Sequence, residues 1–490
     1  MSLITSPFFQ PTRCHQIVFI LSLSYFLLSA ANAQENLHTL PRYNKESKAL
    51  IQQIKENTKT ELDKLTLATR PIYSSHLVET KNYQIERIKD EAYFRSDSLE
   101  EMVVEVANRI IEANQLNIIN PIFLINHEPY AQALTYMNGV FEVSIGLFSV
   151  IENKDQLAFV LAHELVHNVE YHVANAVFEA YESDIEKTVI NEFSRIRNGN
   201  GTLEGLKVMQ AKSYSLFEVS RTNEIISDTL GLAYMSKVGF DVKEAQPILS
   251  AMGYRYMESD HSVEHLLDQL FRKQYPLKAF WLDKGLNIYS KRPDVLFVFD
   301  TDSISTHPDM EVRIQNLVKA TGDDYSKPLN LNSIHDLERL KCVIDGAYSA
   351  RQYDVCLYLS LFLLAQDSSL QRNDSFLVSA ICKVFLGLHK AKYDNLISNH
   401  FSMYVDRYTV DYTDDLRQIN WFLHNLTLEE LAEVGYQFLN KPVNFDMANE
   451  ENYWLLYQFS DLTKRENVAE KIKDSYQEKF PGGRYLKEFE

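Results

Sequence analysis

The chain has 490 residues, which is enough for two or three domains with substantial cores, and a formal net charge of −18 at pH 7. Its hydrophobic fraction of 45% and charged fraction of 24% are typical of globular proteins and exclude wholesale disorder. A surface this acidic repels nucleic acid and anionic lipid, so we expect neither as a primary partner.

The N-terminus has the pattern of a secretory signal peptide. Arg13 precedes an apolar run from Ile17 to Ala30, and Ala31-Asn32-Ala33 is a small-residue cleavage site. We therefore expect residues 1–33 to be removed, the mature chain to be periplasmic or secreted, and no integral membrane span to remain after cleavage. An uncleaved membrane anchor is the alternative.

The next segment, residues 34–97, is predicted to be an N-terminal helical segment to which we assign no chemistry. A firmer domain begins near Ser98, where Ser98-Leu99-Glu100-Glu101 resembles a capping box. Two short strands are expected, one at 122–125 and one at 140–143 after the turn Asn138-Gly139. They predict a small sheet whose edge holds an extended peptide by strand addition, or that only covers the core.

The stretch Leu161 to His167 is predicted to lie on a buried helix that begins after Asn153 as N-cap, because its neighbours are apolar nearly all round. His163 and His167 are four residues apart, so both side chains can reach one metal ion. Glu164 points to the side, where it is better placed to accept a proton from a water at the metal than to bind the metal. A chance match is the alternative, but polar side chains on a buried helix are costly unless something such as a metal satisfies them.

A catalytic zinc site usually has three protein ligands and one open position. The metzincin pattern is excluded, because it needs Gly at position 170 and His at position 173, where the chain has Glu170 and Val173. His172 is close in sequence but falls on a different face of a continuous helix, so we interpret it as structural.

The better candidate for the third ligand is Glu224, on a helix that opens at Arg221 and runs to about Val238. Asp228 shares a face with Glu224, and Gly231 continues that face with room for a neighbouring helix. Glu224 could complete the site, and Asp228 could accept a hydrogen bond from the free ring nitrogen of a ligand histidine and fix its tautomer. An acidic solvated face is the alternative reading.

The order of these motifs resembles the zinc endopeptidases typified by HtpX and the CAAX prenyl protease, over roughly residues 98 to 320. The segment 132–139 also resembles the one that precedes the substrate-binding edge strand in that family, with departures at Gln132, Met137 and Asn138. The motifs that carry the resemblance are His163-Glu164-x-x-His167, His172, Glu224-x-x-x-Asp228, Gly231, Thr306-His307-Pro308 and Arg313.

The resemblance implies a gluzincin site, with one Zn2+ per chain on two histidines and a glutamate, and protein or peptide substrates. The implied metal ligands are His163, His167 and Glu224, with Glu164 as the general base. It also places His307 on a loop near the metal, where it could stabilise the oxyanion or occupy the open position. Alternatively, His307-Pro308 merely starts a helix, and we interpret Arg313 as a structural ion-pair partner outside the site.

Two other regions carry weaker signals. The segment from Glu170 to Val219 is where a protease would place a lid or plug, although an inert helical insertion fits equally. Past Pro328 the pattern is helical, and the stretches 347–354 and 388–394 end two comparable units about 40 residues apart, loosely like the tetratricopeptide period of about 34. Three cysteines remain in that region, Cys342, Cys356 and Cys382, and their apolar context predicts buried residues without disulfides.

The predicted fold is α+β and mainly α. A zincin-like metallopeptidase domain with a small sheet spans residues 98–325, and an all-α region that resembles helical repeats and could bind a protein partner spans residues 326–490. The predicted function is zinc-dependent endoproteolysis outside the cytoplasm, as in the soluble exported branch of the family that acts in envelope protein quality control. The alternative is a non-catalytic chaperone or binding protein that uses the helical region and keeps a vestigial zinc site.

Overall fold

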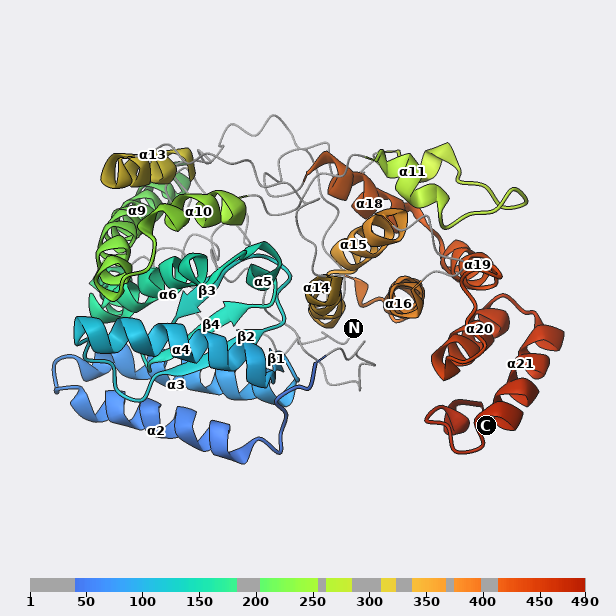
Figure 1. The fold of residues 1–490 in the computed structure, drawn as a ribbon, viewed down its shortest axis with the longest axis horizontal. Helices are drawn as coiled ribbons and strands as arrows, with labels where there is room; N and C mark the ends of the chain where they lie inside the picture. Colours follow the sequence, from blue (N-terminus) through green and yellow to red (C-terminus); the bar gives the residue numbers. More distant parts are fainter. Residues whose placement is uncertain are drawn as a thin grey trace, which may run out of the picture.

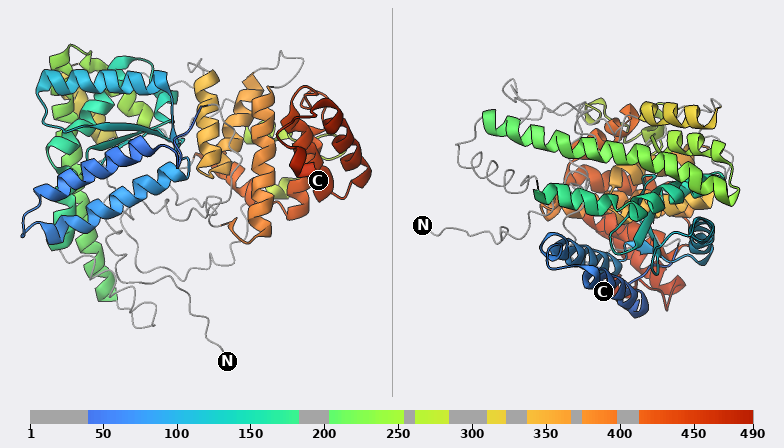
Figure 2. Two further views of the ribbon diagram at one scale, coloured as in Figure 1. Left: turned by 90° about the horizontal axis from the view of Figure 1, so that it is seen from below. Right: turned by 90° about the vertical axis from the view of Figure 1, so that its left-hand side faces the viewer.

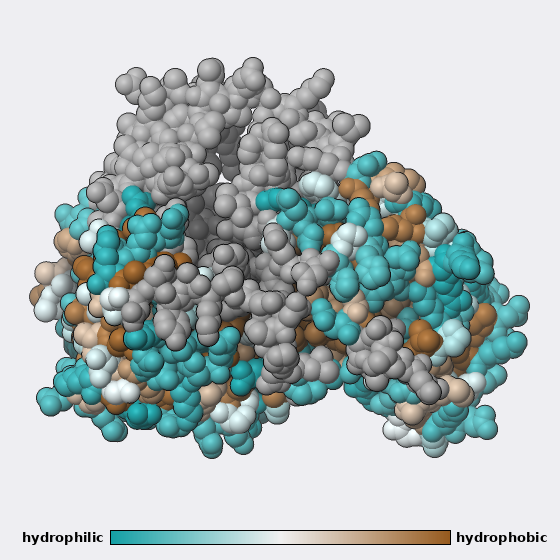
Figure 3. All heavy atoms as spheres, turned by 45° about the horizontal axis from the view of Figure 1, so that its top comes forward, coloured by the Kyte–Doolittle hydropathy of each residue, from teal (hydrophilic) through white to brown (hydrophobic). Residues whose placement is uncertain are grey.

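The computed structural model describes residues 40–182, 203–253, 261–283, 310–322, 337–366, 374–397 and 413–489. These residues form two lobes that lie side by side, one built around a small sheet and one built from helices alone (Figure 1). No helix in these ranges is long and apolar enough to cross a membrane. On the face shown in Figure 3, hydrophilic residues cover most of the coloured surface and hydrophobic ones are interspersed among them. The predicted signal peptide lies outside the described residues.

Within the described residues the sheet has four strands, in the order β1-β2-β4-β3. Strands β2 and β4 pair in parallel, with Phe123 opposite Phe141, and β1 and β3 add to them antiparallel on either side. The two strands expected from the sequence are β2 and β4, and Gly139 forms the predicted turn with a φ of 71°, a conformation that favours glycine. Strand β3 is therefore an edge strand. The bounds are β1 Tyr93–Phe94, β2 Ile122–Asn126, β3 Ala133–Thr135 and β4 Val140–Ser144.

Helices cover both faces of the sheet. Ile54 and Ile88, on α2 and α3, pack against Leu124 and Val140 on one face. Apolar residues of α4 and α6 pack against Phe141 and its neighbours on the other face. The N-terminal helical segment thus forms one layer of this lobe. These helices are α2 (Lys48–Lys64), α3 (Arg70–Lys89), α4 (Asp97–Asn114) and α6 (Lys154–Val169).

Both N-terminal caps expected in this lobe have counterparts in the structure. Asn153 caps α6, and its side chain accepts a hydrogen bond from the backbone N–H of Gln156, as predicted. The cap of α4 lies two residues earlier than predicted, at Ser96, which accepts from the N–H of Leu99. Ser96 has the extended backbone of an N-cap residue, and the helix begins at Asp97. Ser98 is therefore already inside the first turn and cannot serve as the cap.

Further helices complete the first lobe. The longest of them, α9, runs along α6 (Figure 2). The region predicted as a lid or insertion contains α7 and the first half of α9, and residues 183–202 between them lie outside the described part of the chain. The bounds are α5 Leu147–Val150, α7 His172–Glu182, α9 Leu203–Val238, η2 Val242–Glu244, α10 Ala245–Gly253 and α13 Met310–Thr321.

In the described parts of residues 326–490 the regular secondary structure is all helical, as predicted. The predicted unit end at 347–354 spans the turn between α14 and α15, and Arg351 in this turn has a positive φ angle. The predicted unit end at 388–394 is the end of α16, and Asn395, just after it, also has a positive φ angle. A tetratricopeptide relationship remains a prediction. The helices are α14 Leu337–Ser349, α15 Tyr353–Gln366, α16 Ser375–Tyr393, α18 Asp414–Asn425, α19 Leu428–Leu439, α20 Glu450–Leu462, α21 Glu466–Lys479 and η5 Leu486–Phe489.

An earlier segment of the chain, residues 261–283, belongs to the core of this second lobe. It contains α11 (Val263–Asp268) and η3 (Ala279–Trp281). Trp281 is fully buried, stacks on Phe271 at 5.4 Å between ring centroids, and meets Phe422 of α18 edge-on at 6.2 Å. The chain thus enters the helical lobe after α10 and returns to the first lobe at α13.

The two lobes also meet directly through α14. Arg42 makes a buried ion pair with Asp345 of α14 at 2.9 Å, and its guanidinium lies 3.6 Å from the centre of the Phe94 ring. A Cβ atom at Gly346 would lie 2.5 Å from the carbonyl oxygen of His127, so only glycine allows α14 to approach the loop after β2 this closely.

The cysteines of the second lobe form no disulfide. Cys342, Cys356 and Cys382 are all free, as predicted. Cys356 and Cys382 are buried, whereas Cys342 is only partly buried.

Candidate metal centre

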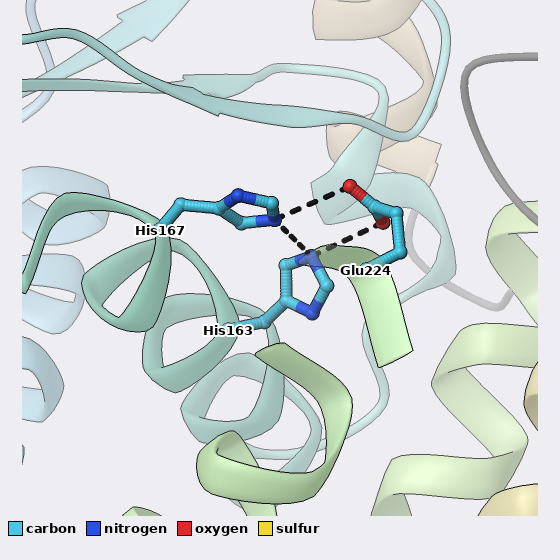
Figure 4. A group of neighbouring side chains, drawn as sticks. All are labelled: His163, His167 and Glu224. Atoms are coloured by element: carbon cyan, nitrogen blue, oxygen red, sulfur yellow. Dashed lines mark hydrogen bonds and ion pairs between the residues drawn. The ribbon is translucent and has the colours of Figure 1, made fainter. Parts of the chain in front are cut away.

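Two histidines project from consecutive turns of α6 toward the same point. The Nε2 atoms of His163 and His167 are 3.0 Å apart, and the ring centroids are 4.7 Å apart (Figure 4). His163 is buried and His167 is partly exposed. The four-residue spacing on a helix brings both rings to one place, as the sequence suggested.

Glu224 reaches the same point from α9. Its Oε2 lies 3.4 Å from Nε2 of His163, and its Oε1 lies 3.2 Å from Nε2 of His167. The three side chains each offer one donor atom, and these atoms all lie within 4.8 Å of one another. They form the candidate metal centre, which joins two helices that are distant in sequence (Figure 4).

The approach of α9 to α6 depends on a small residue at the crossing. A Cβ atom at Gly231 would lie 3.2 Å from the backbone nitrogen of His163 and 3.4 Å from its Cα. Glu224, Ser227, Asp228 and Gly231 share the buried face of α9. The predicted room for a neighbouring helix is therefore filled by α6 itself.

The geometry of these donors fits a small tetrahedral cation. Nitrogen and oxygen ligands held about 2.0–2.2 Å from a tetrahedral ion lie roughly 3.3–3.6 Å from one another. The two Nε2 atoms are 3.0 Å apart, and the two carboxylate oxygens of Glu224 lie 3.2 Å and 3.4 Å from one of these nitrogens each, all within a few tenths of an ångström of that range. Two imidazoles and one carboxylate also leave one of four positions open, as in a catalytic site.

The charges around the site also favour a cation. Oδ1 of Asp228 lies 3.0 Å from Nδ1 of His163, on the side of the ring away from Glu224. Burial disfavours a charge on His163, but hydrogen bonds to Asp228 and Glu224 outweigh it and raise the pKa of His163 to about 10. A metal that binds Nε2 must displace this proton and supply the positive charge in its place.

Arg313 holds the two carboxylates of α9 from the opposite side. Its Nε and Nη2 donate to the two oxygens of Asp228 at 2.8 and 2.6 Å, and its Nη1 lies 3.3 Å from Oε2 of Glu224. Burial acts against the charges of both partners, but the pair lowers the pKa of Asp228 and raises that of Arg313. Glu164 also contributes to the raised pKa of Arg313. Asp228 thus stays ionised beside His163.

His172 lies against the far side of His167. The sequence interpretation placed it on a different face because it assumed that the helix continues, but α6 ends at Val169 and Tyr171 has a φ of 57°. The chain turns back, and Nδ1 of His172 comes 3.1 Å from Nδ1 of His167. Burial and the neighbouring His167 lower the pKa of His172 to about 4.

Glu164 lies one residue after the first histidine on α6 and is partly exposed. The sequence assigned it the role of general base and not of ligand. Among the described residues, the cluster of possible metal ligands consists of His163, His167 and Glu224, without Glu164.

The remaining site residue predicted from the resemblance, His307, lies outside the described residues. Arg313 is the residue that sequence reasoning set aside. Its interpretation as an ion-pair partner agrees with the structure, but its partners are the acids of the metal centre itself. A signal was present, because Arg313 shares the helical face of Ile314 and Leu317, and an arginine on an apolar face needs a buried acid.

The comparison with protein families covers this whole site, because the model of peptidase family M48 matches residues 95–321. This part of the chain belongs to peptidase family M48. The M48 domain includes both histidines, Glu164, Glu224, Asp228 and Arg313. The resemblance to the family of HtpX and the CAAX prenyl protease is thereby confirmed, and the domain is a metallopeptidase whose substrates are proteins or peptides. A search among curated proteins found no match.

Gly231→Ala in the M48 domain should weaken metal binding without unfolding the protein. The added methyl group presses on the backbone of His163, at a cost of about 1–3 kcal/mol, while alanine restores about 1 kcal/mol of helix propensity. We expect about a tenfold loss of zinc affinity, measured by competition with a chelator. Ser236→Ala, at an exposed position of α9, is the matched control and should leave the affinity unchanged. Equal affinities for both variants would show that α9 does not depend on this close approach.

Proposed function

We propose that the chain is a zinc endopeptidase that cleaves proteins outside the cytoplasm. The observation that carries the proposal is the convergence of His163, His167 and Glu224 within an M48 domain. Two imidazoles and one carboxylate with an open fourth position are the ligand set of well-known catalytic zinc sites. One Zn2+ per chain would bind there.

Zinc, when bound, would polarise the scissile carbonyl and acidify a water molecule. Glu164 would accept the proton of the attacking water on its carboxylate and pass it to the nitrogen of the leaving amine. Asp228 would hold His163 through Nδ1, so that Nε2 faces the metal with its lone pair. Arg313 would keep Asp228 and Glu224 ionised and in place.

The edge of the sheet supports an extended substrate. In the described part of the chain, β3 pairs with β4 on one side only, and it lies next to α6, the helix of the two histidines. Leu134 at the centre of β3 is 39% exposed. An unfolded polypeptide could add to this edge as a further strand and bring a backbone carbonyl to the metal. Most of the backbone of a folded protein is already paired within it, so unfolded or misassembled proteins are the proposed substrates.

Export is proposed from the first 33 residues and their apolar run, and a role in envelope protein quality control follows from the proposed location and substrates. We expect the protein purified from its native host to begin at Gln34 and to fractionate with the envelope or the medium. N-terminal sequencing and cell fractionation measure both. A cytoplasmic protein that retains residues 1–33 would contradict the proposed location.

Removal of the metal tests the proposed activity. We expect cleavage of unfolded casein to stop after dialysis against a chelator and to return when about one equivalent of Zn2+ per chain is added back. The measurement is release of fluorescent casein peptides together with the zinc content. A chelated, metal-free protein that still cleaves casein would refute a zinc-dependent reaction. Full zinc occupancy without cleavage of casein or of native envelope proteins would instead favour a non-catalytic binding protein.

A further inference from the structure

Three imidazoles stand in a row at the candidate metal centre, with His167 in the middle. Its ring centroid is 4.7 Å from that of His163 and 4.9 Å from that of His172. The contact with His163 is made by the two Nε2 atoms, whereas the contact with His172 is made by the two Nδ1 atoms, 3.1 Å apart. The two nitrogens of His167 therefore face different partners.

The proton count on His167 follows from this arrangement. A neutral imidazole that gives the Nε2 lone pair to a metal carries its proton on Nδ1. That N–H of His167 points at Nδ1 of His172, which can accept it only if His172 carries its own proton on Nε2. With its proton on Nδ1, His167 can bind a metal through Nε2 and donate to His172, provided that His172 carries its proton on Nε2.

His172 is held in the accepting position by its surroundings. It is 6% exposed, and the turn at Tyr171 directs its ring back toward α6. The hydroxyl oxygen of Ser227, a fully buried residue of α9, lies 3.3 Å from the same Nδ1 atom. Ser227 is three residues from Glu224, so the contact ties His172 to the helix that supplies the third ligand.

We propose that His172 is a positioning residue that fixes the tautomer and the ring orientation of His167 for metal binding. The proposal rests on the proposed function, because it assumes a metal at Nε2 of His167. It divides the support of the two ligand histidines between an anion and a neutral ring: Asp228 holds His163, and His172 holds His167. The second partner orients its ligand without adding negative charge to a site that already contains Glu224 and Asp228.

Two substitutions separate this role from simple packing. His172→Leu keeps an apolar side chain of similar bulk but removes the acceptor, whereas His172→Asn places an oxygen near the position of Nδ1. We expect His172→Leu to lower zinc affinity about 10- to 100-fold and His172→Asn to remain within about threefold of the wild type. Ser227→Ala removes one contact of His172 but leaves the contact between the rings intact, so its loss of zinc affinity should be smaller than that of His172→Leu.

The measurements are zinc affinity by competition with a chelator and the visible absorption bands of the protein loaded with Co2+. The bands should shift in His172→Leu and not in His172→Asn, because only the former lets the His167 ring turn. Thermal unfolding without metal establishes that each variant is folded.

Other outcomes overturn the proposal. Wild-type affinity and bands in His172→Leu would do so, and so would equal losses in both variants, which would indicate packing alone. A wild-type protein that binds no zinc would remove the basis of both proposals. Tight zinc binding without proteolysis would contradict the proposed function and leave the affinity test of His172 decisive.

Discussion

Glu164→Gln should bind zinc as tightly as the wild type and cleave casein about 10²- to 10⁴-fold more slowly. The substitution keeps the size and polarity of the side chain but removes the carboxylate that would accept the proton of the attacking water. Metal content should not change, because the three donor atoms that converge belong to His163, His167 and Glu224. The measurement is the initial rate on fluorescent casein, with zinc determined on the same sample.

A second glutamine substitution serves as the control for Glu164→Gln. Glu170 is the exposed C-cap residue of α6, and replacing it by Gln removes the same charge at the end of the same helix. Glu170→Gln should retain the wild-type rate. If Glu164→Gln cleaves casein as fast as this control, Glu164 is not the general base.

Arg313→Met should destabilise the metal-free protein by about 3–5 kcal/mol, the usual cost of removing one partner from a buried ion pair. It leaves Asp228 and Glu224 buried without the cation that now lies within 2.6 to 3.3 Å of them. We expect a smaller loss with saturating zinc, because the bound cation replaces part of the missing positive charge and stabilises the folded state. Urea denaturation with chelator and with zinc measures both values.

Two comparisons make the Arg313 experiment specific. Arg313→Lys keeps the charge but not the two-pronged contact with Asp228, so its loss should be intermediate. Arg484→Met removes a largely exposed arginine that pairs with Glu450 and Glu451, and pairs made by an exposed arginine contribute about 0–1 kcal/mol each. A loss in Arg313→Met no larger than in Arg484→Met would show that the buried carboxylates need no guanidinium.

Local signals in the sequence were sufficient for the helix of the two histidines and for the central strands. Helix α6 combines a cap at Asn153 with an apolar run, and both features act within a few residues. The turn at Gly139 and the strand that follows it are local in the same way. Strands β1 and β3, with two and three residues, are defined only by pairing with their neighbours, so no local pattern marks them.

At the metal centre, the residues whose placement depends on local spacing were predicted, and those whose placement depends on the tertiary fold were not. Glu224 and Asp228 could be assigned because four-residue spacing places them on one face whatever that face meets. Tyr171 has a positive φ without being glycine, so no residue preference announced the turn that brings His172 to His167. Arg313 required knowing that α13 meets α9, which depends on packing between helices far apart in the chain.

Because residues 261–283 pack in the helical lobe, they cannot be buried until the C-terminal residues of that lobe have been synthesised. Trp281 and Phe271 find their partner Phe422 only after roughly 140 more residues have been made. The aromatic side chains of residues 261–283 become buried only once the C-terminal lobe has been made. Arg313, which pairs with the acids of the metal centre, lies on α13, the helix that follows this segment. A growing chain would therefore carry both histidines and Glu224 well before its fold is complete. A chain truncated after residue 321 would contain every described residue of the metal centre. Its Phe271 and Trp281 would still lack Phe422 and the other C-terminal residues that bury them.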